Sequence, residues 1–367
     1  MIDRIMRAPE SKRIFLIFCI VLVLMNACPS VWAVTKRGGL KLSPLLLYSS
    51  ESGFGGGAAL SYLYPSQKGV RVNGLLLGAF MLYSRDEQFS GELKWEQLWR
   101  ERSYASSVDL YGGKYRERFY GIGSNTSPGA GETYTNQSIA TKLVLRRIFT
   151  SDLSLGIGYE LGSSEISDVR EGGLLDRTQL LGAEGGVDSG LGMFLLFDSR
   201  DNRYYPLSGW LSLFSIWGYS CVLGGDYVYS RFAVDVRKYV STFPSHVIAL
   251  QGHMRLMSGD VPFTRLSLLG GSSLLRGYER GRYRDKAMLI FQTEYRMPLI
   301  WRLGTVLFAN IGDVSEDITG FRLEEFKYSF GVGARLLLNN SERIHLRFDY
   351  AAGIDSSGFY IALTEAF

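Results

Sequence analysis

Arg343-Ile344-His345-Leu346-Arg347-Phe348-Asp349-Tyr350 alternates without exception: each even position is apolar or aromatic, and each odd position is charged or histidine. A period of two indicates a β-strand with one apolar and one polar face. The pattern returns in Phe326–Arg335 and in Tyr229–Arg237. Alternation fits a soluble β-sandwich as well as a membrane barrel, so the class of β-protein depends on the rest of the chain.

The first 33 residues have the pattern of an export signal. Two basic residues precede the twelve apolar residues 14–25, and Val31-Trp32-Ala33 forms a small-residue cleavage site. Twelve apolar residues are too few to cross a bilayer. We expect cleavage after Ala33, which leaves residues 34–367 as one domain; the alternative is lipidation at Cys28, for which Met25-Asn26-Ala27 is a poor lipobox.

Composition narrows the function classes. The 367 residues include 43 Gly, 22 Tyr and 21 Phe, which favours many strands. After the signal, basic and acidic residues nearly balance, which argues against a nucleic-acid partner. Cys221 is then the single cysteine, so no intrachain disulfide is predicted. Three histidines, with no paired nucleophile and base and no metal-ligand cluster, predict neither an enzyme nor a cofactor or metal.

Sixteen strands of about ten residues are predicted, the length of a tilted transmembrane strand. Most connections after even-numbered strands are tight turns, and the connections after odd-numbered strands include the long loops, as in outer-membrane barrels. The sequence therefore predicts an all-β, 16-stranded antiparallel transmembrane barrel in the bacterial outer membrane, with fourteen strands as the alternative. The strands begin near Leu40, Phe54, Val70, Glu87, Tyr104, Tyr134, Leu153, Gly190, Gly209, Tyr227, His246, Lys286, Leu303, Phe326, Arg343 and Gly358.

The longest loop and the strand after it carry a candidate ion pair. The glycine-rich segment Gly270–Tyr278 contains Arg276, and Gln292–Pro298 contains Glu294. A carboxylate facing lipid is costly, so Glu294 is expected to point into the lumen. Arg276, on a loop folded inward, would then form a charge-assisted pair with it.

Three segments together resemble the BamA/TamA superfamily of outer-membrane barrels, the bacterial surface-antigen family. Arg276-Gly277-Tyr278 is similar to the tip of the family's inward-folded sixth extracellular loop, and Glu294–Pro298 to the strand that follows it. Phe197–Gly209 resembles a periplasmic hairpin motif, carried by Asp198, Arg200, Asp201, Pro206 and Gly209.

The resemblance also implies partners for these residues, with two departures. The family usually has an aspartate as the second partner of the loop arginine, and the best-matching position here is Asn310. Phe367 matches a C-terminal targeting signal, but Glu365 stands where an aromatic residue is usual.

The function implied is assistance with insertion or translocation of protein or lipid at the outer membrane. The implied partners are outer-membrane lipids, the barrel-assembly machinery during biogenesis, and a protein or lipid client. No POTRA repeat is expected between the signal and the first strand, which would make this a stand-alone barrel. The alternative is a passive pore or structural protein, in which lumen arginines such as Arg231 and Arg237 favour anions.

Overall fold

The computed structural model describes residues 39–49, 53–63, 77–84, 88–99 and 103–367. The predicted signal peptide, with Cys28 and Ala33, lies outside the described residues, as does the predicted strand start at Val70.

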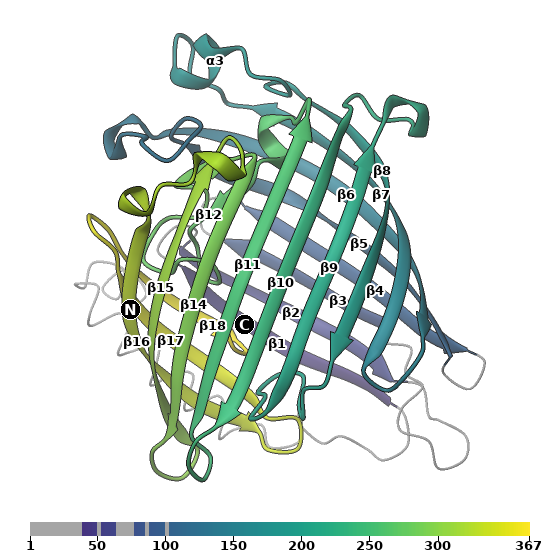
Figure 1. Cartoon of the computed structure of the whole chain (residues 1–367), viewed down its shortest axis with the longest axis vertical. Helices are drawn as coiled ribbons and strands as arrows, with labels where there is room; N and C mark the ends of the chain where they lie inside the picture. The colour runs from purple at the N-terminus through teal and green to yellow at the C-terminus, as the bar shows by residue number, and fades with distance from the viewer. Residues whose placement is uncertain (1–38, 50–52, 64–76, 85–87, 100–102) are drawn as a thin grey trace, which may run out of the picture.

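Sixteen antiparallel strands form one closed barrel, which confirms the predicted fold class (Figure 1). The chain alternates in direction at each strand, and β12 and β13 form a separate two-stranded sheet inside one long loop. The barrel strands are β1 (Gly39–Ser49), β2 (Gly53–Leu63), β3 (Leu77–Ser84), β4 (Phe89–Trp99), β5 (Tyr104–Phe119), β6 (Glu132–Ile148), β7 (Leu153–Ser167), β8 (Gly185–Asp198), β9 (Gly209–Tyr219), β10 (Tyr229–Ser241), β11 (Val247–Gly259), β14 (Ala287–Pro298), β15 (Leu303–Ser315), β16 (Lys327–Asn339), β17 (Ile344–Ala352) and β18 (Ser357–Leu363).

The predicted starts that lie within the described residues agree with the structure to within two residues, except at β8, which begins at Gly185 instead of Gly190. Here Asp188 and Ser189 are both buried: Asp188 binds Arg265, and Oγ of Ser189 donates to the carbonyl of Leu223, both in the long connections. Because these two adjacent residues are both polar, the apolar–polar alternation is interrupted at this point. The alternation therefore did not predict the first five residues of β8.

Short helical turns lie in the connections: α3 (Leu174–Thr178), η3 (Pro128–Ala130), η4 (Cys221–Leu223), η5 (Phe263–Arg265), η6 (Ile318–Gly320) and η7 (Leu323–Glu325). Within the part of the chain that the structure describes, no helix has the length and apolarity needed to cross a membrane. The long connections gather at one end of the barrel, here called the long-loop end, and the β10–β11 and β16–β17 turns lie at the other, the short-turn end (Figure 1).

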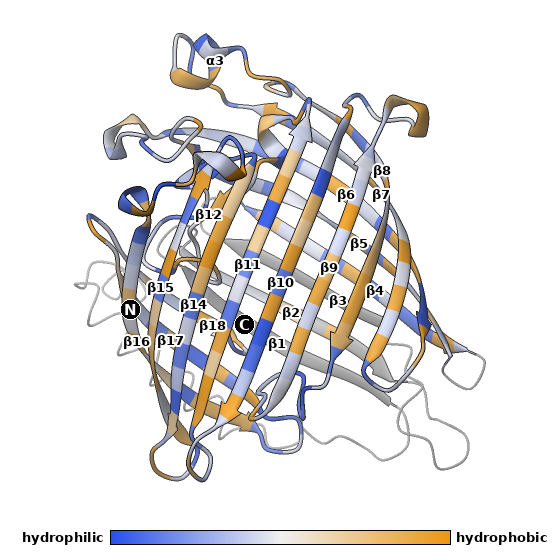
Figure 2. Cartoon of the chain, viewed as in Figure 1, coloured by the Kyte–Doolittle hydropathy of each residue, from blue (hydrophilic) through white to orange (hydrophobic). Residues whose placement is uncertain are grey.

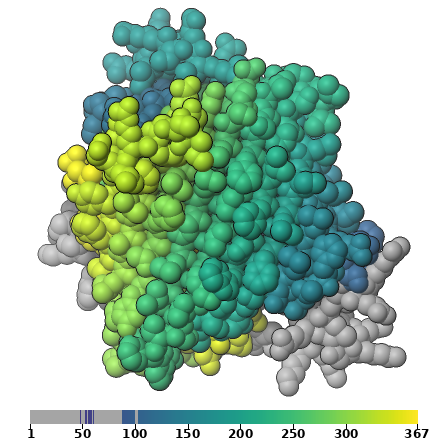
Figure 3. All heavy atoms as spheres, in the orientation of Figure 1, coloured from purple at the N-terminus to yellow at the C-terminus, as the bar shows by residue number. Residues whose placement is uncertain are grey.

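The outer face of the wall is apolar. Apolar and polar residues alternate as bands along the strands (Figure 2), and alternate residues of β8, from Leu191 to Phe197, are exposed on the outside. A space-filling view from the same side shows the side chains of β9, β10, β11 and β14 packed into one wall beneath the long loops (Figure 3). An apolar outer band around a polar interior is the pattern of a lipid-embedded barrel.

The sheet closes between its first and last strands. Among the described residues, β1 and β18 pair through two residue pairs, Tyr48 with Ile361 and Ser49 with Tyr360. By contrast, β1 pairs with β2 over eleven residues, although β2 contains Gly53, Gly55, Gly56 and Gly57 and glycine in a strand weakens pairing. The weak side of β1 is therefore the seam that joins the two ends of the sheet.

Candidate functional site

The connection between β11 and β14 folds into the lumen. It contains β12 (Ser267–Leu269) and β13 (Tyr283–Asp285), which pair with each other. Apolar side chains anchor it: Leu269, Leu275 and Tyr278 pack with Met288 and Ile290 of β14 in one buried cluster. Burial of these loop side chains offsets the entropy of ordering a long segment.

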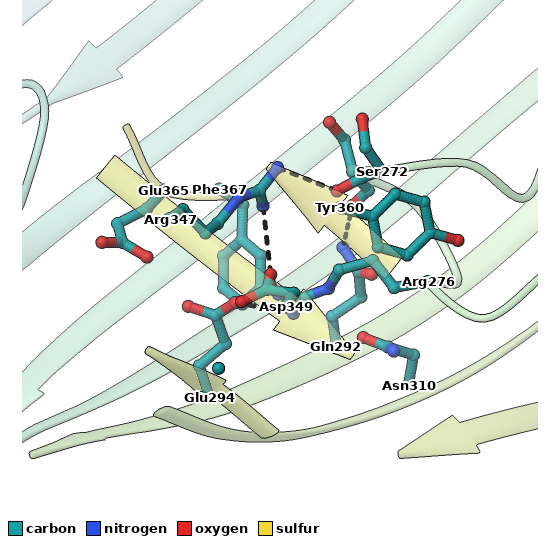
Figure 4. Close-up of polar contacts among 12 residues, drawn as sticks. Ser272, Arg276, Gln292, Glu294, Asn310, Arg347, Asp349, Tyr360, Glu365 and Phe367 are labelled. Carbon is teal, nitrogen blue, oxygen red and sulfur yellow. Dashed lines mark hydrogen bonds and ion pairs between the residues drawn. The ribbon is translucent and has the colours of Figure 1, made fainter. Parts of the chain in front are cut away.

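Arg276 is the centre of the inward-folded loop. Its Nη2 lies 2.6 Å from Oε1 of Glu294 on β14, and its Nη1 lies 2.7 Å from Oδ2 of Asp349 on β17. All three side chains are fully buried. The guanidinium also lies over the ring of Phe308, 3.6 Å from its centroid. We call Arg276, Glu294 and Asp349 the Arg276 lock (Figure 4).

Asn310 does not supply the second partner of Arg276, in contrast to the expectation from the sequence. Its Nδ2 donates to Oγ of Ser329, 2.9 Å away, and the second carboxylate is that of Asp349. Sequence comparison missed Asp349 because it lies two strands beyond the strand of Asn310. The sequence feature that could have identified Asp349 is the alternation of residues 343–350, which puts Asp349 on the polar face of its strand.

The neighbours of Arg276 hold the loop backbone. Gly277 has φ of 105°, and an added Cβ would lie 3.1 Å from the backbone nitrogen of Gly353. Its amide donates to Oη of Tyr360, while Oη of Tyr278 donates to the carbonyl of Tyr328. Gly277 therefore permits an approach between the loop tip and the β17–β18 turn that a larger residue would hinder.

Two polar side chains of the wall bind loop carbonyls. Gln292 donates to the carbonyl of Ser273 and accepts from the amide of Leu275. Arg347 donates to the carbonyl of Ser272, the contact drawn beside the lock in Figure 4. The loop is thus fixed along its main chain as well as at Arg276.

Phe367 also lies inside the barrel. β18 ends at Leu363, and the chain turns at Thr364, whose φ is 66°. Phe367 then packs with Tyr239, Val247 and other buried residues of the opposite wall. Its carbonyl accepts from Nη2 of Arg296, which also binds Glu294 at 2.8 Å. The sequence placed Phe367 at the end of the closing strand, whereas the structure folds residues 364–367, here called the tail, across the lumen.

The predicted hairpin motif forms the β8–β9 connection. Asp198 and Arg200 make a two-pronged ion pair, with N–O distances of 2.8 and 2.9 Å. Gly209 has φ of 107°, and a Cβ there would lie 2.3 Å from the carbonyl oxygen of Ser199. Pro206 is buried at the same turn.

Asp201 ties this hairpin to the β16–β17 turn across the short-turn end. One carboxylate oxygen accepts from the amides of Leu207 and Ser208, and the other lies 2.6 Å from Nη1 of Arg343. Burial opposes ionisation of Asp201, but the bonds from Arg343 and the two amides outweigh it and hold its pKa below the usual range.

The loop and the tail therefore meet at Glu294 and Arg296 of β14, and Leu207 of the hairpin packs against the cluster that contains Phe367. All three belong to a barrel whose outer face is apolar. The sequence matches the model of the Omp85 superfamily domain over residues 73–363. This chain belongs to the Omp85 superfamily. The predicted resemblance to the BamA/TamA barrels is thereby confirmed at the level of the family, which is one of outer-membrane β-barrels.

Solved structures of similar fold include BamA from Haemophilus ducreyi lacking POTRA domains 1–3, with a TM-score of 0.62 at 15% identity over 89% of this chain and 70% of that one. CdiB from Acinetobacter baumannii has a TM-score of 0.57 at 14% identity, over 91% of this chain and 61% of that one. CdiB from Escherichia coli has a TM-score of 0.58 at 9% identity, over 90% of this chain and 63% of that one. This Omp85 chain spans less than two thirds of either CdiB, and at these identities the likeness concerns the fold alone. A search of curated protein sequences finds no match.

Among the described residues, no group of three or more His, Cys, Asp or Glu side chains is placed to hold a metal ion. The one cysteine in the described part, Cys221, is exposed and free. The chemistry offered by the site is thus ion pairing and hydrogen bonding inside a barrel, with a seam that few backbone bonds close.

Proposed function

We propose that this Omp85 barrel assists the insertion or translocation of protein or lipid at the bacterial outer membrane, by opening between β1 and β18. The observation that carries the proposal is the seam between β1 and β18, because among the described residues its two residue pairs form the shortest ladder of any neighbouring barrel strands, so opening it exposes the fewest unpaired backbone groups. A client strand or a lipid would then enter the membrane sideways through the wall.

The Arg276 lock supports this proposal by its position. Arg276 reaches Asp349 on β17, and Gly277 binds Tyr360 on β18. The loop thus ties β17 and β18, the two strands on one side of the seam, to β14, which is separated from β17 by β15 and β16. We propose that the loop, with Arg276, Gly277 and Tyr278, fixes one edge of the seam while the other edge, β1, moves.

Cross-linking the seam tests this function. In a Cys221→Ser background, Tyr48→Cys with Ile361→Cys joins a directly opposed pair across the seam. We expect the oxidised variant to fail to restore the outer-membrane inventory of proteins and lipids after depletion of the wild-type protein, and reductant to restore it.

The matched control is Met193→Cys with Ile216→Cys, a directly opposed and outward-facing pair of β8 and β9. Its disulfide leaves the seam free, so it should complement under oxidising conditions. Equal complementation by the oxidised seam variant would exclude opening at β1 and β18.

The alternative is a passive pore. Two observations argue against an open pore. The inward-folded loop and the tail occupy part of the lumen, and the arginines that were expected to attract anions are paired with carboxylates. Arg231 pairs with Glu160, and Arg237 pairs with Asp235. A large, steady single-channel current in planar bilayers would favour the pore.

A further inference from the structure

A cavity of about 830 Å³ remains in the lumen, beside the segments that fill the other side. Residues of β4 to β11 line it, from Asp198 and Arg200 at the short-turn end to Tyr111 and Trp217 deeper inside. No residue of the Arg276 lock contributes to its lining. We call this space the Trp217 chamber.

The wall of the chamber is shaped to seat an indole ring. Trp217 is buried, and a Cβ at Gly192 would lie 2.2 Å from its ring, while one at Gly158 would lie 2.8 Å from it. Two cations lie over this ring: Nζ of Lys142 at 4.7 Å and the guanidinium of Arg231 at 5.5 Å from a ring centroid. Such contacts hold cations in place without neutralising their charge.

The carboxylates around the chamber are largely committed to other cations. Glu160 binds Arg231 at 3.0 Å, lies 3.9 Å from Arg265, and accepts from Oη of Tyr219. Further lining pairs join Lys94 with Asp109, Arg146 with Glu96 and Arg200 with Asp198.

Three lining cations have no carboxylate within 4 Å among the described residues: Lys142, Arg203 and Arg255. Nε of Arg255 is buried without a hydrogen-bond acceptor. Both ring nitrogens of His253 are buried without a hydrogen bond, although Nδ1 lies 3.8 Å from Oδ2 of Asp235. Buried donors in native proteins nearly always bind an acceptor. Arg255 lies on β11 beside the β10 strand of Arg231, so these donors and the two cations over Trp217 belong to one region of the wall.

We propose that the Trp217 chamber binds a phosphate-type oxyanion, with Arg255 and Lys142 as its principal donors. A guanidinium presents a fork of N–H groups that matches two oxygens of a phosphate, and an ammonium adds a compact charge. The volume admits a larger molecule that carries this group. The inference does not depend on opening of the seam, and its test needs no insertion activity.

The test uses the full chain, purified in an uncharged detergent and titrated with inorganic pyrophosphate by calorimetry at fixed ionic strength. Wild-type protein should bind with saturation at one site. Arg255→Gln and Lys142→Gln should each weaken binding about tenfold, the loss of one charged hydrogen bond, whereas Lys142→Arg, which keeps the charge, should retain it. Heat-modifiable gel mobility checks that each variant is folded.

The matched control is Arg116→Gln, which removes the same charge from a residue lining two other cavities. It should bind as wild type does. The proposal is overturned if wild-type protein does not bind, or if Arg116→Gln weakens binding as much as Arg255→Gln does.

A second titration identifies the source of the phosphate. Soluble short-chain phosphatidic acid is compared with glycerol 3-phosphate, which has the same phosphate without acyl chains. Tighter binding of the lipid assigns the chamber to a lipid headgroup, and equal binding assigns it to a soluble phosphate. Either result supports the proposal only if Arg255→Gln weakens the binding of the phosphate compound about tenfold, as it should weaken the binding of pyrophosphate.

Discussion

Asp349 contacts three arginines at once. Its oxygens lie 2.7 Å from Arg276, 2.6 Å from Arg335 and 3.6 Å from Arg347. Arg347 has no other carboxylate within 4 Å among the described residues. Glu294 in turn contacts both Arg276 and Arg296. Asp349 thus neutralises more arginines than Glu294 does. Removing the Asp349 carboxylate should therefore change the stability of the barrel differently from removing the Arg276 guanidinium.

We therefore expect Asp349→Asn to destabilise the barrel more than Arg276→Gln. The first leaves Arg347 buried without a counter-charge, at a cost of about 3–5 kcal/mol. The second leaves each carboxylate with at least one guanidinium, at a cost of about 1–3 kcal/mol. Urea unfolding in lipid vesicles measures the free energy of unfolding of both variants.

Arg280→Ala is the matched control, because it removes an arginine of the same loop whose side chain is largely exposed. It should change the free energy of unfolding little. If Asp349→Asn lowers the free energy of unfolding no more than Arg276→Gln does, the contacts of Asp349 with several arginines do not contribute to stability in this way.

At the scale of elements, the tail joins three parts of the lumen. Glu365 lies 2.7 Å from Arg335 on β16, Phe367 packs with Leu207 of the β8–β9 hairpin, and its carbonyl binds Arg296 on β14. Residues 364–367 thus act as a strap across the short-turn end, although the sequence suggested a terminal strand. Recognition of Phe367 as a C-terminal targeting signal stays a prediction from the sequence.

Removing the Phe367 ring should open this end of the lumen. We expect Phe367→Ala to cost about 3–5 kcal/mol of stability, as for other buried aromatics, and to give a larger, steadier single-channel current than the wild type. Phe243→Ala, which truncates an exposed phenylalanine of the nearby β10–β11 turn, should leave both properties unchanged. An unaltered current in folded Phe367→Ala would show that the tail does not obstruct the lumen.

The number of backbone pairs between neighbouring strands differs around the circumference of the barrel. Among the described residues, β5 and β6 pair over sixteen residues, whereas β1 and β18 share two pairs. Since local opening breaks the contacts of one region only, the free energy of opening should be lowest where the ladder is shortest.

Hydrogen–deuterium exchange followed by mass spectrometry measures this difference in the vesicle-embedded protein. Amides of β18 should exchange well before those of β5 and β6, because fewer ladder bonds must break. The Tyr48→Cys, Ile361→Cys disulfide should slow exchange in β18 and leave β5 and β6 unaffected. Uniform protection around the barrel would contradict a weak seam.

Local patterning was sufficient to predict the sixteen strands and the Arg276–Glu294 contact. A strand's two faces are encoded in consecutive residues, such as 343–350, and a carboxylate on the polar face of a barrel strand can only point inward. The glycine at position 277 likewise follows from a local backbone requirement.

The tertiary structure alone determined the second partner of Arg276, the inward path of Phe367 and the Trp217 chamber. These depend on which residues of distant strands meet across the lumen, and that is set by the register and closure of the sheet rather than by any short segment. No local feature of Asp349 or Asn310 predicts which of them contacts the loop. Asp349 binds Arg276 because the curvature of the sheet turns the inward face of β17 toward that of β14, from which it is separated by β15 and β16.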